Sequence, residues 1–216
     1  MSTFTGLVEN LDGLGGPTPV VDPTNLPFPP PARSSAILAL LSRGGATGQP
    51  DLLFTERAHD LRSHPGQVSF PGGRIDPGDP TPEDAAVREA AEEVGLEPEA
   101  VELLGRLPSS PLVASFNATV VVGAWDGDHA LVPEPGEVAQ ILRYPVDLLA
   151  SPDVRRSAKL PNGRSGPAFV VDDIVIWGFT AHLVDRLLAL GGWAGDWDTD
   201  ALIDVPERFW RGRRIR

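Results

Sequence analysis

An acidic helix with capping residues at both ends is the feature that most constrains how this chain folds. Thr81 belongs to the residue types that cap helices, and Pro82 and Glu83 stand where proline and acids favour a helix start. Gly95 stands where a left-handed C-terminal cap is expected. We therefore predict a helix over residues 82–94.

Three acids of this helix are spaced i, i+3 and i+4, namely Glu89, Glu92 and Glu93. Side chains so spaced are neighbours, and like charges there destabilise a helix by about 0.2–0.5 kcal/mol per pair. A bound divalent cation makes the same arrangement favourable, because carboxylate oxygens are ligands that suit Mg²⁺ or Mn²⁺. The spacing therefore indicates a metal site. The alternative is a solvated acidic face on which Arg88 pairs with Glu92.

A glycine-rich loop leads into this helix from a short strand that ends at Phe70. Gly72 and Gly73 permit unusual backbone angles and let backbone atoms approach a ligand closely. A carbonyl group of this loop is therefore a further candidate metal ligand. The alternative is that both glycines serve only the turn.

The rest of the chain predicts an α/β or α+β sandwich, with a sheet between helical layers. A second helix is expected over residues 179–190, and residues 172–173 form a turn between two strands. Val87, Ala90 or Ala91, and Val94 form an apolar stripe that holds the acidic helix against the sheet. Strands are predicted at 35–43, 51–57, 67–70, 101–107, 118–125, 169–171 and 174–177, and residues 137–143 form a strand or a short helix.

The two ends of the chain differ in composition from the middle. Residues 1–33 are rich in proline and predict an extended arm after a short helix near residues 5–11. Residues 34–195 form the predicted domain. The remaining tail, residues 196–216, is read as solvated. Its arginines are Arg208, Arg211, Arg213, Arg214 and Arg216.

Composition excludes several classes of function. The 216 residues contain no cysteine, which excludes disulfides, thiolate nucleophiles and Cys-ligated zinc. A net charge of −12 disfavours broad nucleic-acid binding, because that binding needs an excess of Lys and Arg. No long apolar run or signal peptide is evident, so we expect a cytoplasmic protein without a membrane span. The sequence is compatible with a homodimer but does not determine the oligomeric state.

The stretch from Gly73 through Arg88 to Leu96 resembles the Nudix box, the signature of hydrolases that act on nucleoside diphosphates linked to another group. Asp79 stands where the usual box has Glu, and one extra residue precedes Arg88. Both departures are similar to the coenzyme A diphosphatase branch of the family. The segment from Leu53 to Gly73, with its Arg57 and Arg62, looks like a motif of the same branch.

The resemblance implies a Nudix-type α/β/α sandwich with a mixed central sheet. It also implies hydrolysis of coenzyme A to 3′,5′-ADP and 4′-phosphopantetheine. Acyl-CoA or oxidised CoA would be further substrates. It implies Mg²⁺ or Mn²⁺ on Glu89 and Glu93, with Glu92 and the Gly72 carbonyl assisting. Either Glu92 or Glu137 is the general base, and Arg88 orients a glutamate.

Substrate contacts are expected from Arg57, Arg62 and Gly73, since arginine recognises phosphate through paired hydrogen bonds. An ion pair of Arg57 with Glu56 or Asp60 is the alternative. Phe179 is read as a core residue rather than a surface for a base. Two other functions stay open, namely a Nudix hydrolase acting on ADP-ribose, NADH or another nucleoside diphosphate derivative, and a non-catalytic Nudix-like domain that binds a nucleotide.

Overall fold

A mixed seven-stranded sheet forms the centre of the molecule in the computed structural model, which describes residues 4–13, 34–44, 48–108, 116–159 and 163–209. The sheet runs β3-β2-β1-β6-β5, with β4 paired to β1 and β7 paired to β2. Among the described strands of this sheet, only β1 and β6 pair in parallel. The strands are β1 Ser35–Ser42, β2 Asp51–Arg57, β3 Val68–Ser69, β4 Gly72–Arg74, β5 Glu102–Arg106, β6 Ala118–Trp125 and β7 Val138–Pro145.

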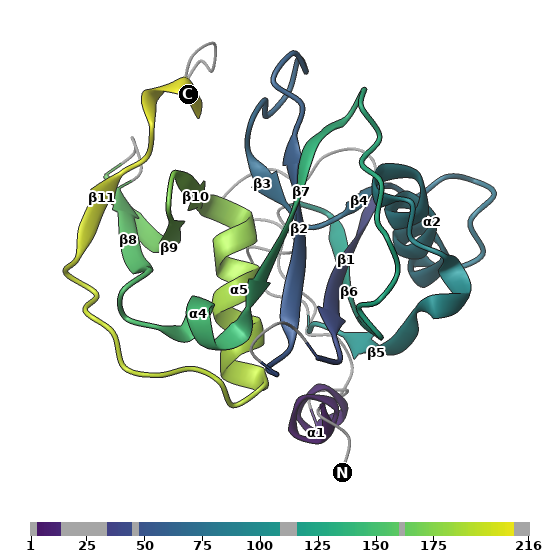
Figure 1. The fold of residues 1–216 in the computed structure, drawn as a ribbon, viewed down its shortest axis with the longest axis horizontal. Helices are drawn as coiled ribbons and strands as arrows, with labels where there is room; N and C mark the ends of the chain where they lie inside the picture. The colour runs from purple at the N-terminus through teal and green to yellow at the C-terminus, as the bar shows by residue number, and fades with distance from the viewer. Residues whose placement is uncertain (1–3, 14–33, 45–47, 109–115, 160–162, 210–216) are drawn as a thin grey trace.

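Helices cover both faces of this sheet (Figure 1). Helix α2, Pro82–Val94, lies on one face, and helix α5, Gly178–Leu190, lies on the other. Strand β1 serves both layers, because alternate side chains of a strand point to opposite faces. Leu38 and Leu40 pack in the cluster under α2, while Ala39 and Leu41 pack in the cluster under α5. The predicted α/β/α sandwich with a mixed central sheet is confirmed.

A second sheet lies beyond α5 and was not predicted as a separate layer. It has four strands in the order β10-β9-β8-β11, namely β8 Arg155–Lys159, β9 Ser165–Val171, β10 Ile174–Ile176 and β11 Leu202–Asp204. The short helix α4, Val146–Ala150, leads from β7 toward it. Asp172 lies in the predicted turn between β9 and β10 with a positive φ of 52°.

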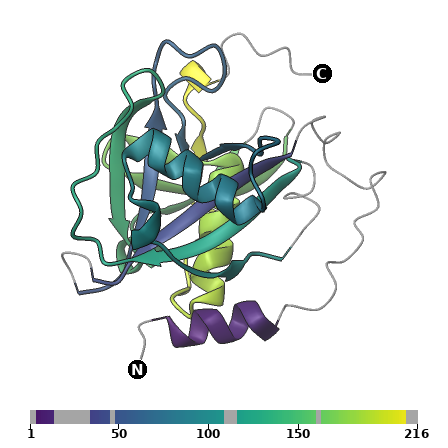
Figure 2. The ribbon, with the colours of Figure 1, turned by 90° about the vertical axis from the view of Figure 1, so that its right-hand side faces the viewer.

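Two segments outside residues 34–195 pack against the folded unit. Helix α1, Thr5–Gly13, buries Leu7 and Leu11 in the same core cluster as α5 (Figure 2). Strand β11 pairs in parallel with β8, and the 3-10 turn Glu207–Phe209 follows it. The proline-rich residues 14–33 and the arginines beyond Arg208 lie outside the described residues. Among the described residues, no helix combines the length and apolar character needed to cross a bilayer.

The predicted apolar stripe of α2 is partly wrong. Ala85, Ala86, Ala90 and Val94 are buried as the face that meets the sheet, but Val87 is only half-buried. Each residue of an α-helix advances by about 100° around the axis. Val87 therefore lies at the edge of the buried face, whose middle is formed by Ala90 and Val94. The small alanines bring the α2 backbone close to β1, and this closeness determines where the acids point.

Candidate active site

The caps of α2 hold the acidic helix in a defined position. The Thr81 hydroxyl accepts a hydrogen bond from the Asp84 amide at 3.2 Å, as an N-cap does. Gly95 adopts the left-handed conformation with φ 67°, and its amide donates to the Ala91 carbonyl. The loop before β7 also closes this end, because the amides of Val132 and Glu134 donate to the carbonyls of Val94 and Glu93.

Glu93 is a buried carboxylate beside the glycine loop. It is 5% exposed, and its Oε2 accepts a hydrogen bond from the Gly72 amide at 3.2 Å. Burial raises the pKa of Glu93 to about 7, because desolvation disfavours the charged form, while the Gly72 hydrogen bond and the charge of Arg57 act in the opposite direction. The carboxylates of Glu89 and Glu137 raise the pKa further. The carboxylates of Glu89 and Glu137 are therefore close enough to Glu93 to affect its protonation.

Glu89 occupies the space that a side chain at position 73 would need. A Cβ atom built on Gly73 would overlap the Glu89 carboxylate, and a Cβ on Gly72 would lie 2.5 Å from the Ala36 carbonyl oxygen. Gly72, with φ 154° and backbone atoms at this distance, therefore requires glycine, whereas a side chain at position 73 would displace the Glu89 carboxylate. Burial also raises the pKa of Glu89, with the Arg88 guanidinium acting in the opposite direction.

Arg57, at the end of β2, and Glu137, in the turn before β7, are both close enough to Glu93 for their charges to act on it. Arg57 ends β2, and its position is tied to the loop before β7 because the Ala58 amide donates to the Glu137 carbonyl at 2.8 Å. The Nε atom of Arg57 is buried and has no hydrogen-bond partner in the part of the chain that the structure describes. No ion pair of Arg57 with Glu56 or Asp60 is found among these residues. Glu137 is exposed at the mouth of the site.

Glu92 points away from this group. It is 61% exposed, and its Oε2 accepts a hydrogen bond from Arg88 Nη1 at 3.0 Å. Arg88 also contacts Glu89 at 3.0 Å and holds Asp79 through Nε at 2.9 Å and Nη2 at 3.1 Å. These hydrogen bonds hold the pKa of Asp79 below its usual value. The role of Asp79 as a partner of Arg88 was not predicted, because nine positions and an unusual loop separate the two residues.

The donor set fits a divalent cation through two carboxylates rather than three. Glu89 and Glu93 both lie against the glycine loop. The charge of Glu89 raises the pKa of Glu93, and the charge of Glu137 raises the pKa of both, as crowded negative charges do. In the described part of the chain, no group of three or more Asp, Glu or His side chains is arranged to hold a metal ion. The predicted metal role of Glu92 would require its release from Arg88.

Comparison with known proteins now identifies the family. Residues 31–161 match the NUDIX domain. The chain belongs to the Nudix family. It is 38% identical to the uncharacterized Nudix hydrolase NudL of Enterobacter sp. (strain 638) over 160 residues, which is 72% of this chain and 81% of that protein. NudL of Escherichia coli (strain K12) is 36% identical over the same shares of both chains. The crystal structure of DR0079 from Deinococcus radiodurans is 22% identical with a TM-score of 0.47, covering 73% of this chain and 86% of that one.

Membership of the Nudix family makes this protein a hydrolase that acts on the pyrophosphate bond of a nucleoside diphosphate derivative with a divalent cation. The Nudix box predicted from the sequence coincides with β4 and α2, where Glu89 and Glu93 meet the glycine loop. The individual roles of the site residues stay predictions.

Arg62 lies on the loop that joins β2 to β3. The amide of Arg57 donates to the Gln67 carbonyl at 3.0 Å, and the Gly66 amide donates to the Arg57 carbonyl at 3.0 Å, so the base of this loop is closed. Arg62 is exposed within it, five residues after Arg57. Figure 1 shows the loop extending beyond the end of the sheet. Among the described residues, no ion pair joins Arg62 to Glu89 or Glu93.

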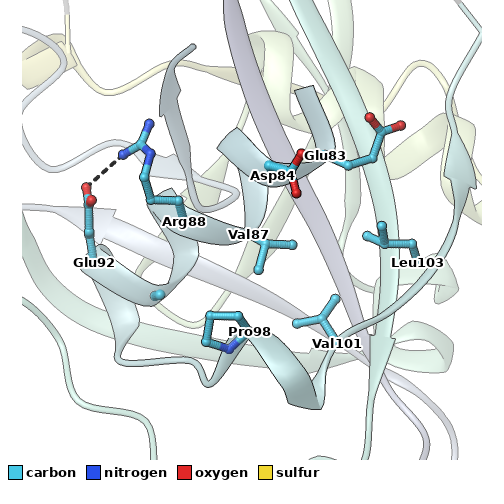
Figure 3. Close-up of a pocket in the computed structure, with 9 residues that line it drawn as sticks. Glu83, Asp84, Val87, Arg88, Glu92, Pro98, Val101 and Leu103 are labelled. Carbon is cyan, nitrogen blue, oxygen red and sulfur yellow. Dashed lines mark hydrogen bonds and ion pairs between the residues drawn. The ribbon is translucent and has the colours of Figure 1, made fainter. Parts of the chain in front are cut away.

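A groove of about 590 Å³ runs along a different side of α2 (Figure 3). Its floor is apolar and its rim carries charged side chains, and it contains neither of the loop glycines nor Glu89 or Glu93. Glu83 on its rim is paired with Arg106. The groove is lined by Glu83, Asp84, Val87, Arg88, Ala91, Glu92, Pro98, Val101 and Leu103. This groove is therefore separate from Glu89 and Glu93 of the Nudix box.

We expect Glu93→Gln to stabilise the metal-free protein at high pH. The pKa of Glu93 is about 7 in the folded chain against an ordinary value of 4.5, so only the folded state binds this proton between these values. Stability is therefore lost as pH rises from about 4.5 through 7. The loss amounts to about 3 kcal/mol above pH 7, at about 1.4 kcal/mol per pKa unit.

Urea unfolding with a chelator at pH 5 and pH 8 measures this effect. The stability advantage of Glu93→Gln over the wild type should be small at pH 5 and large at pH 8. Glu92→Gln, which removes an exposed charge from the same helix, is the matched control. A wild type and a Glu93→Gln variant with the same pH dependence of stability would contradict the burial argument.

Proposed function

We propose that this Nudix hydrolase cleaves the diphosphate bond of coenzyme A to give 3′,5′-ADP and 4′-phosphopantetheine. The observation that carries the chemistry is the meeting of Glu89, Glu93 and Arg57 at the Gly72–Gly73 loop. The buried Glu93 carboxylate beside the half-buried Glu89 favours a cation, and a buried guanidinium Nε without a partner among the described residues needs an acceptor. A divalent ion together with a diphosphate supplies both.

Glu89 and Glu93 would hold Mg²⁺ or Mn²⁺, with the Gly72 carbonyl assisting. The bound cation supplies charge neutralisation of the diphosphate and lowers the pKa of a water molecule. Arg57 donates hydrogen bonds to a phosphate oxygen, for which its unpartnered Nε atom is suited. Arg88 holds Glu89 and Glu92 in place rather than contacting substrate, since its guanidinium is already used by three carboxylates.

Glu137 is the better candidate for the general base that removes a proton from the attacking water. Its charge acts on both Glu89 and Glu93, whereas the charge of Glu92 acts on Glu89 only. Glu92 is also held by Arg88. An exposed carboxylate at the mouth of the site has access to water, and a base within hydrogen-bond reach of the attacking water fits this position.

Coenzyme A as the substrate is supported by the likeness of the β2–β3 segment to the coenzyme A diphosphatase branch and by the two arginines in it. Coenzyme A carries a 3′-phosphate besides its diphosphate, so it needs more cationic contacts than ADP-ribose or NADH. Arg57 ends β2 and its charge acts on Glu93, whereas Arg62 lies five residues later on the exposed loop that follows. This separation suits one arginine for the diphosphate and one for the 3′-phosphate.

Mass spectrometry of the products formed from coenzyme A in ¹⁸O-labelled water with Mg²⁺ tests the proposal. We expect 3′,5′-ADP and 4′-phosphopantetheine, one of which carries the label. ADP-ribose and NADH are assayed beside coenzyme A. Faster hydrolysis of either of these than of coenzyme A would overturn the substrate, and binding without cleavage of any of them would overturn the activity.

Arg62→Ala is expected to raise KM for coenzyme A by about 10- to 150-fold, because one charge-assisted hydrogen bond to phosphate contributes about 1.5–3 kcal/mol. KM for a dinucleotide without a 3′-phosphate should change little. Steady-state kinetics on both substrates measure the difference, with Arg74→Ala as a control that removes another arginine near the glycine loop. Equal increases of KM for both substrates would mean that Arg62 does not recognise the 3′-phosphate.

A further inference from the structure

The groove beside α2 has an apolar floor that is open to solvent. Val87 and Ala91 form it from the helix, and Val101 and Leu103 form it from the chain that enters β5 (Figure 3). Leu103 is 48% exposed. An exposed apolar surface with a polar rim is typical of a site at which another chain binds. The proposed diphosphate chemistry takes place at the glycine loop and gives this surface no use.

The rim of the groove is acidic. Glu83, Asp84 and Glu92 stand there against a single cation, Arg88. Glu92 is 61% exposed and pairs with Arg88 through Oε2. The Asp84 carboxylate accepts a hydrogen bond from the Thr81 hydroxyl at 2.6 Å, and no ion pair joins it to a described residue. A ligand that fits this groove therefore combines apolar side chains with positive charge.

One segment of this chain has the complementary composition. Residues 210–216, called the basic segment below, contain four arginines, one tryptophan, one isoleucine and no acid, in a chain with a net charge of −12. Tryptophan and arginine are the residue types that most often carry the binding energy of protein interfaces. Arginine also binds carboxylates through paired hydrogen bonds. Charge and apolar content together favour the basic segment as the occupant of the groove.

The described end of the chain lies on the far side of the molecule from the groove. Phe169 of β9 packs in the core cluster under α5, whereas its neighbour Ala168 packs with Phe209 in a separate cluster. Successive residues of a strand point to opposite faces, so Phe209 lies on the face of the second sheet that points away from α5. From that sheet to α5, to the central sheet and to α2 there are three layer spacings of about 10 Å each. Residues 210–216 span at most about 25 Å when fully extended, so those of the same copy do not reach the groove.

We propose that the groove binds the basic segment of a second copy of this chain, and that two copies exchange these segments in a closed dimer. Helix α2 and strand β11, which leads toward the basic segment, lie at opposite ends of the molecule (Figure 1). Two copies that lie side by side in opposite directions therefore bring each segment to the groove of the other. Two identical contacts of this kind close a two-fold dimer. The inference does not depend on the substrate, because no residue of the glycine loop takes part.

Sedimentation equilibrium of the full chain tests the dimer. We expect a dimer at low salt that dissociates at about 1 M salt, where the Debye length is about 3 Å. A chain that ends at Phe209, and the double variant Arg213→Glu/Arg214→Glu, should be monomeric at both salt concentrations. Leu103→Arg should weaken dimerisation by at least about tenfold, because it removes apolar contact and adds a like charge. Leu202→Arg changes a strand leucine that is 49% exposed outside the groove and is the matched control.

A mixture of two variants tests which surfaces meet. Leu103→Arg keeps the basic segment, and the chain that ends at Phe209 keeps the groove. Each should be monomeric alone at a concentration at which together they form a mixed dimer, since one segment and one groove are still complementary. Removal of the basic segment changes no described residue, so this half of the test does not depend on how the groove variant folds.

Several results would overturn the proposal. A full chain that is monomeric at low salt would leave the basic segment to its own copy or to solvent. A dimer that survives removal of the basic segment would use another surface. Loss of the dimer on that removal, with full dimerisation of Leu103→Arg or with no mixed dimer, would place the basic segment outside the groove. Hydrolysis of coenzyme A is measured separately, so failure of the dimer and failure of the proposed function are distinguishable.

Discussion

Glu93→Gln should reduce turnover by at least about a hundredfold in a protein that stays folded. Glutamine keeps the size of the side chain and can still accept the hydrogen bond from the Gly72 amide. It removes the negative charge that binds a cation, and the loss of metal-borne charge stabilisation typically costs that much or more. Turnover with saturating Mg²⁺, together with Mg²⁺ affinity from calorimetry, measures the effect.

Glu97→Gln, an exposed acid just after α2, is the matched control and should keep normal turnover. Near-normal turnover of Glu93→Gln at saturating Mg²⁺ would remove Glu93 from the mechanism. The same variant is expected to be more stable than the wild type at pH 8 without metal. The combination of higher stability and lower turnover distinguishes a functional carboxylate from a structural one, because stabilising a strained site usually costs activity.

Glu137→Gln should lower kcat by about 100- to 10,000-fold with little change in KM, the range expected for loss of a general base. The backbone contact between the Ala58 amide and the Glu137 carbonyl does not depend on the side chain, so the loop should keep its position. Steady-state kinetics with coenzyme A and Mg²⁺ measure both constants.

Glu134→Gln, three residues earlier on the same exposed loop, provides the control for Glu137 and should change kcat little. Glu92→Gln is measured in parallel, because the sequence left Glu92 and Glu137 as equal candidates. A large loss of kcat in Glu92→Gln with a normal Glu137→Gln enzyme would transfer the role of base to Glu92. A large loss of kcat in both variants would indicate that Glu92 also contributes to turnover, through its effect on Glu89.

Local patterns were sufficient for the elements that carry the site. The ends of α2 follow from Thr81, Pro82 and Gly95, because capping depends on residues within one turn of the helix end. Strand β2 has the bounds that its apolar run predicted. The strand-or-helix alternative for residues 137–143 is resolved as strand β7, because pairing with β2 is a long-range contact that a local pattern does not contain.

The sequence by itself determined the Nudix box, the positions of most strands along the chain, the acidic helix and the residues from which a metal site would be built. Only the tertiary structure decided which acids face the glycine loop. Equal spacing on a helix makes Glu89, Glu92 and Glu93 neighbours, but contact with β1 and β4 buries Glu93, brings Glu89 against Gly73 and leaves Glu92 with Arg88. The approach of Glu137 to Glu93 and of Phe116 to Phe179 likewise joins residues far apart in the chain, and such contacts depend on how the layers pack rather than on any local pattern.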